Sequence, residues 1–169
     1  PLLRHIAQAT RGTDREISTS IILAKALRLA GQVREAEEMF RSLITRSEAQ
    51  GKYRLASVAA SELFQILLQT GRFEEALELV EEMKAYTRQA GLGPWDQLLD
   101  EGMRLQVLNS LGRYDEVLKS VEDLKMQIRS LPEESEQEES AVPWNVREGI
   151  LDTGRSAAMR SEKHEQALE

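Results

Sequence analysis

The chain has 169 residues, of which 41% are hydrophobic and 30% charged, with no cysteine, two histidines and a formal net charge of −7. This length suits one domain that buries a core without disulfide bonds, and the lack of cysteine excludes thiol catalysis, iron–sulfur clusters and thiolate zinc sites. His5 and His164 stand too far apart in the sequence to suggest a multi-histidine metal site, and the acidic balance argues against a surface that binds nucleic acid.

Nothing in the sequence predicts a membrane segment or a targeting signal. No stretch reaches the roughly 18 apolar residues of a membrane-spanning helix, and residues 1–4 lack the features of a signal peptide. We therefore expect a cytoplasmic protein without membrane contact. The chain begins at Pro1 and ends within a predicted helix, so we interpret it as a segment of a longer protein.

The predicted elements are helices separated by glycine turns. Residues 1–12 carry apolar residues on one helical face and are predicted to be the end of a preceding helix. Three similar segments then recur at nearly equal spacing: GQVREA from Gly31, GRFEEALE from Gly71 and GRYDEVL from Gly112. Before each glycine, apolar residues recur three and four apart. Alternation of the strand type is absent.

Glycine takes a positive φ without a Cβ penalty, so it can end a helix and reverse the chain. Gly31, Gly71 and Gly112 are therefore predicted to be the turns within helix pairs, and Gly51 and Gly91 to close the second helices. The small residue five positions after each turn glycine would let the paired helices approach closely. The sequence thus predicts an all-α solenoid of antiparallel helix pairs.

The pattern G-x-[aromatic or aliphatic]-x-x-[small]-x-x-x-[apolar] at these three glycines resembles the tetratricopeptide repeat (TPR). Its period of about 40 residues exceeds the usual 34, as in long-period members that resemble kinesin light chain and the sensor arms of bacterial regulatory NTPases. The resemblance implies one right-handed superhelical solenoid domain. Its predicted parts are repeat 1 (13–51), repeat 2 (52–91), repeat 3 (92–131) and a truncated repeat 4 (143–169), in which KHEQALE aligns with Arg72–Glu78 and places a turn at Glu162.

Two irregular features interrupt the repeats. Residues 132–142 lie in a glutamate-rich stretch that cannot bury enough apolar surface to order itself, so we predict a solvated acidic loop in preference to a docking arm. Trp95 and Trp144 each follow a proline that suits the first turn of a helix. We expect both rings to pack as wedges between repeats, in preference to stacking on a ligand.

The resemblance also implies a binding surface. TPR arrays hold partners on a concave face formed by the first helix of each pair, so polar residues that interrupt the apolar pattern there are candidates. They are Lys25, Arg28, Glu62, Gln65, Gln69, Met103, Gln106 and Asn109, with Asp152, Thr153 and Ser156 as the equivalents in repeat 4. Amides can pair with a peptide backbone in either polarity. The alternative is that these residues are merely solvated.

The leading hypothesis is a non-catalytic module that binds a protein or peptide, as a scaffold arm of a larger regulatory or signalling protein. The chain lacks phosphate-binding glycine loops, and its carboxylates are predicted to lie on exposed helix faces, so we expect no enzyme activity, cofactor or metal. One alternative is an effector-sensing arm of a bacterial NTPase or transcription regulator. Another is an architectural module that forms homo-oligomers through uncapped solenoid ends, where we expect Ala167 and Leu168 to be exposed. The TPR clamp for C-terminal carboxylates is not matched, because its positions hold Ile21, Lys25, Glu62, Leu99 and Met103.

Overall fold

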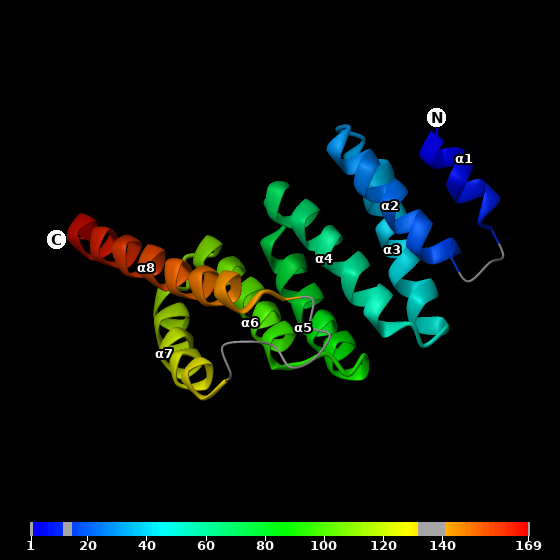
Figure 1. Cartoon of the computed structure of the whole chain (residues 1–169). Coiled ribbons are helices and arrows are strands. Elements are labelled where there is room, and N and C mark those ends of the chain that lie inside the picture. The colour runs from blue at the N-terminus through cyan, green and yellow to red at the C-terminus, as the bar shows by residue number, and fades with distance from the viewer. Residues whose placement is uncertain (1, 12–14, 132–140, 169) are drawn as a thin grey trace. The chain divides into compact units, whose positions relative to one another are not determined.

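The structure is a computed structural model that describes residues 2–11, 15–131 and 141–168, without the side chains of residues 7 and 163–168. These described residues form eight α-helices and no β-strand (Figure 1). The helices are α1 (Leu2–Ala9), α2 (Glu16–Leu29), α3 (Val33–Ala49), α4 (Tyr53–Gln69), α5 (Phe73–Gln89), α6 (Pro94–Ser110), α7 (Tyr114–Ser130) and α8 (Pro143–Leu168). The predicted all-α class is confirmed. Residues 132–140 of the predicted acidic loop lie outside the described residues.

The chain divides into two compact units, which we describe separately. Unit 1 consists of Pro1–Arg72 and Ala85–Ala90, and unit 2 of Phe73–Lys84 and Gly91–Glu169. Unit 1 therefore holds α1 to α4 and the end of α5, and unit 2 holds the rest of α5 with α6, α7 and α8. The arrangement of all repeats in one solenoid domain stays a prediction.

Short turns that contain glycine connect the helices from α2 to α7. After α6, the Gly112 N–H donates to the Asn109 carbonyl (3.3 Å) and the Arg113 N–H donates to the Leu108 carbonyl (2.9 Å). This pair of bonds is a Schellman motif, and Gly112 has a φ of 74° within it. Among the described residues, the glycines with positive φ are Gly31, Gly51, Gly71, Gly91 and Gly112. The three turn glycines predicted within helix pairs are among them.

The turn predicted at Glu162 is wrong. Helix α8 runs without interruption from Pro143 to Leu168, so the residues aligned with a second helix continue the first one. The physical reason is the residue type at position 162. Glutamate is a good helix former, and an L residue in the left-handed region costs about 1–2 kcal/mol.

Unit 1 buries one apolar face from each of α2, α3 and α4, and α3 packs against both α2 and α4. Ala36, five residues after Gly31, is fully buried, which fits its predicted role at a close approach of helices. The larger fully buried side chains of unit 1 are Ile17, Phe40, Leu63, Phe64, Ile66 and Leu67. Burial of each such side chain contributes about 1.5–3 kcal/mol to stability.

In unit 2, α8 packs against α6 and α7 (Figure 1). Val146 and Ile150 of α8 are buried in the core of this unit. A Cβ atom at Gly154 would lie 3.1 Å from Cγ1 of Val121 on α7, so this glycine allows α7 and α8 to approach closely.

The two tryptophans have different environments. Trp95 is buried in the core of unit 2, with the Arg147 guanidinium 5.1 Å from its ring centroid. Trp144 is 69% exposed, so its predicted role as a wedge is wrong. The reason is helical phase, because Trp144 lies nearly opposite Val146 around α8 and so points away from the core when Val146 is buried.

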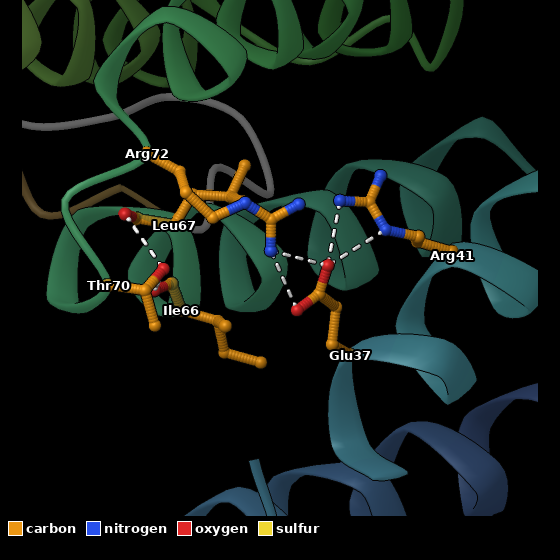
Figure 2. Close-up of polar contacts among 6 residues, drawn as sticks. All are labelled: Glu37, Arg41, Ile66, Leu67, Thr70 and Arg72. Carbon is orange, nitrogen blue, oxygen red and sulfur yellow. Dashed lines mark hydrogen bonds and ion pairs between the residues drawn. The ribbon is translucent and has the colours of Figure 1, made fainter. Parts of the chain in front are cut away.

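A carboxylate with two arginine partners joins α3 to the end of α4 in unit 1. Nη1 of Arg72 donates to both carboxylate oxygens of Glu37 (2.8 and 2.9 Å), and Nη2 of Arg41 donates to Oε1 (2.9 Å) (Figure 2). In the same turn, the Thr70 hydroxyl donates to the Ile66 carbonyl (2.8 Å). Burial alone would raise the pKa of Glu37, but the hydrogen bonds from Arg72 and Arg41 outweigh it and lower the pKa below its ordinary value of 4.5.

We predict that Gly112→Ala lowers the free energy of unfolding by about 1–2 kcal/mol, because alanine is strained at this φ. Space is not limiting, since the added Cβ would meet only the Tyr114 hydroxyl at 4.0 Å. The matched control is Gly149→Ala in α8 of the same unit, where the Cβ meets nothing within 4 Å and φ is not positive. This variant should keep or gain stability, by up to about 1 kcal/mol. Urea denaturation measures both, and equal losses would contradict the prediction.

The lowered pKa of Glu37 makes its contribution to stability depend on pH. The carboxylate binds a proton more readily in the unfolded chain, so its contribution is present above about pH 4.5 and is lost as the pH falls through the folded-state pKa. We expect Glu37→Gln to lower the free energy of unfolding by about 1 kcal/mol at pH 7. The difference from the wild-type chain should shrink below pH 4.5.

Urea denaturation of the wild-type chain and Glu37→Gln at pH 7 and pH 3 tests this dependence. Glu38→Gln is the control, because Glu38 is an exposed neighbour on the same helix. Its effect should stay within about 0.5 kcal/mol at both pH values. A loss in the Glu37 variant that did not change with pH would refute the assignment.

Candidate functional site

The first helices of unit 1 expose the same helical face at the same spacing. On α2 this face carries Ser18, Ile22, Lys25 and Leu29, and on α4 it carries Val58, Glu62, Gln65 and Gln69. The members within each helix are four, three and four residues apart, so they lie along one stripe. The two sets are offset from each other by one predicted repeat. We call these eight residues together with Arg28 the first-helix face of unit 1.

An ion-pair cluster at the centre of this face joins α2 to α4. Nζ of Lys25 lies 2.8 Å from one carboxylate oxygen of Glu62, and Nη2 of Arg28 lies 3.0 Å from the other. The side chain of Arg28 is 18% exposed and that of Lys25 is 45% exposed. One carboxylate faces two cations, so the cluster keeps a local excess of positive charge.

Around the cluster, the first-helix face combines apolar and amide side chains. Ile22, Leu29 and Val58 are exposed large hydrophobic residues. Gln69 is exposed and Gln65 half-buried, and neither side chain forms a hydrogen bond within the described residues. Ile22 and Val58 were not predicted to belong to the site. A signal for Ile22 was present, because it stands one repeat before the predicted candidate Glu62.

The candidates from the third repeat lie in unit 2. Met103 is half-buried and Gln106 exposed on α6. Nδ2 of Asn109 donates to the Ser156 hydroxyl of α8 at 3.2 Å, so the structure brings these two predicted positions together. Asp152 forms an ion pair with Arg155 at 3.1 Å, and the Thr153 hydroxyl donates to the Gly149 carbonyl within α8. Beside Ser156, an open depression of about 440 Å³ is lined by Asp152, Arg155, Met159 and Arg160.

A second surface of unit 1 was not predicted from the sequence. An open groove of about 540 Å³ lies among α1, α2 and α3 and is lined mainly by polar side chains. Arg4 pairs with Glu35 at 2.8 Å, and Arg46 pairs with Glu16, so most of its charges are already balanced. Partners that lie on different helices, far apart in the sequence, leave no local signal, which explains why this groove was missed.

The described residues show neither a membrane-spanning helix nor a metal-binding cluster. No described helix is both long enough and apolar enough to cross a membrane. Among the described side chains, no three of His, Asp and Glu gather where a metal ion could bind. The expected cytoplasmic location stays a prediction.

Two sequence-family models match parts of the chain. The model described as a tetratricopeptide repeat matches residues 18–42, which span most of α2 and the start of α3. The model described as a PPR repeat matches residues 61–86, which span the end of α4 and most of α5. No curated protein sequence matches the chain.

Two solved structures are similar over nearly the whole chain. One is a Podosopora anserina protein assigned as a kinesin light chain with nearly identical TPR-like repeats, which is 18% identical, with a TM-score of 0.69 over 97% of this chain and 80% of that chain. The other is a form of that protein with a single substitution, which is 19% identical, with a TM-score of 0.69 over 97% of this chain and 79% of that chain. At this identity the likeness shows the fold alone, which is an all-α TPR-like repeat fold.

We predict that the two ion pairs of Glu62 differ in strength. A double-mutant cycle with Arg28→Met and Glu62→Gln should give a coupling energy of about 1–2 kcal/mol, because Arg28 is largely screened from solvent. The same cycle with Lys25→Met should give about 0.5 kcal/mol or less, as for an exposed pair. Urea denaturation of the single and double variants measures both energies, and equal couplings would contradict this ranking.

Proposed function

We propose that this chain, which belongs to the TPR-like repeat family, is a non-catalytic module that binds a protein or an extended peptide. Repeat folds of this kind commonly act as protein-interaction scaffolds. The observation that carries the proposal is the first-helix face of unit 1, where exposed apolar side chains and unpaired amides surround the Lys25–Glu62–Arg28 cluster.

The chemistry of this face fits a peptide. Exposed Ile22, Leu29 and Val58 can cover apolar side chains of a partner. The amides of Gln65 and Gln69 can donate to and accept from a peptide backbone. The excess positive charge beside Glu62 favours a partner with acidic side chains. We propose that the partner is an extended, moderately acidic segment with apolar anchors.

In unit 2, Gln106 and Asn109 would serve the same purpose. Nδ2 of Asn109 is engaged with Ser156, while its Oδ1 atom is buried and accepts no hydrogen bond within the described residues. A role as the scaffold arm of a larger regulatory or signalling protein belongs to the proposal.

The PPR match does not lead us to propose RNA binding. Residues 61–86 contain six glutamates against Arg72 and Lys84, so the matched segment is itself acidic and would repel phosphates. An effector-sensing arm differs from a scaffold in its ligand, because a small effector would replace the peptide on the same face. The test of the proposal therefore measures the binding of both peptides and RNA.

Selection from a displayed library of random dodecapeptides tests the proposal. The selected peptides are labelled, and their dissociation constants are measured by fluorescence anisotropy. We expect at least a tenfold loss of affinity for the double variant Gln65→Ala/Gln69→Ala and for Leu29→Glu. The control Gln89→Ala, an exposed glutamine in the second helix α5, should change affinity less than twofold.

A library that yields no binder, or binders that these face variants leave unchanged, would refute the proposed site. Binding of single-stranded poly(U) that falls with salt would instead support the RNA function. Gln106→Ala and Asn109→Ala, measured with the same peptides, report whether unit 2 takes part.

A further inference from the structure

Helix α8 exposes an apolar stripe on the side that faces away from the core of unit 2. Trp144, Leu151 and Met159 are 69%, 47% and 54% exposed. They recur at seven and eight residues, so they lie on one face. The opposite face carries Val146, Ile150, Gly154 and Ala157, which are buried where α8 meets α6 and α7.

Two opposite charges lie in the same stripe. Glu148 stands between Trp144 and Leu151, and Arg155 stands between Leu151 and Met159. Both are exposed, and Arg155 keeps most of its exposure even though it pairs with Asp152 at 3.1 Å. From Trp144 to Met159, the stripe therefore carries in turn an aromatic, an acidic, an aliphatic, a basic and a thioether side chain.

This order of side chains is complementary to the same order on a second helix that runs in the opposite direction. Trp144 and Met159 lie equally far, about 11 Å, from the point midway between residues 151 and 152, and Glu148 and Arg155 lie about 5 Å from it. An antiparallel copy of the helix would place each Trp144 opposite a Met159 and each Glu148 opposite an Arg155, with the two Leu151 side chains at the centre. Such an arrangement is an isologous two-fold interface.

We propose that the exposed stripe of α8 binds the same stripe of a second copy of this chain, in antiparallel orientation. Two Glu148–Arg155 ion pairs fix the register, and the Trp144–Met159 contacts gain from the affinity of sulfur for aromatic rings. Two helices bury a small area, so the dimer is weak and depends on concentration. This inference is independent of the peptide-binding face of unit 1.

Sedimentation velocity over a wide range of protein concentrations tests the proposal. We expect the wild-type chain to form dimers, and Glu148→Arg or Arg155→Glu alone to raise the dissociation constant about tenfold or more, because each creates two like-charge contacts. The double variant Glu148→Arg/Arg155→Glu should return to within about threefold of the wild type. An equal mixture of the two single variants should form a heterodimer, since their charges then match across the interface.

Three controls separate this interface from general effects of charge. Met126→Glu places a charge on another exposed methionine of unit 2, on α7, and should leave dimerisation unchanged. Asp152→Asn removes the ion pair with Arg155 within the helix and should change the dissociation constant of the dimer less than threefold. Leu151→Glu should abolish dimers while circular dichroism shows that the helices are retained. A chain that stays monomeric, a double variant that is not rescued, or a dimer that Leu151→Glu leaves intact would overturn the proposal.

Discussion

The left-handed backbone of the glycines that end the helices is the constraint on which both units depend. These glycines have φ values between 65° and 79°, and an L residue there is strained. The turns reverse the chain through backbone hydrogen bonds, and the N-cap residues of α2 to α7 form no side-chain cap bond. They also set the helix length, since α3 to α7 each have 17 residues. Helix α3, with the turns on either side of it, sets the offset of one repeat between the exposed faces of α2 and α4.

The positions of the turns were predictable from the sequence because glycine determines them. Gly31, Gly71 and Gly112 combine a helix end with an apolar pattern on each side, and both signals agree. The predictions for α8 failed because only part of the repeat pattern is present there. KHEQALE resembles a second helix, but no glycine precedes it, and α8 continues. Trp144 follows the same proline context as Trp95, yet its place on the helix relative to Val146 decides its exposure.

The candidate site was predictable as a set of positions but not as a set of contacts. The repeat spacing identifies Lys25, Gln65 and Gln69 as members of one kind of helix face. It does not show that Glu62 accepts from both Lys25 and Arg28, because these partners belong to different repeats. The pairing of Asn109 with Ser156 is likewise a property of packing between α6 and α8.

Three ion pairs of unit 1 connect helices that belong to successive predicted repeats, in addition to the Gly51 turn and the packing of α3 against α4. Arg4 with Glu35, Arg28 with Glu62 and Arg72 with Glu37 each link segments that are distant in the sequence. Salt screens such partly exposed pairs but leaves the backbone bonds of the turns intact. Neighbouring repeats are thus joined both by ion pairs that salt weakens and by apolar packing and backbone bonds that it leaves intact. Raising the ionic strength therefore weakens the polar contacts between the repeats of unit 1, while its apolar core holds the helices together.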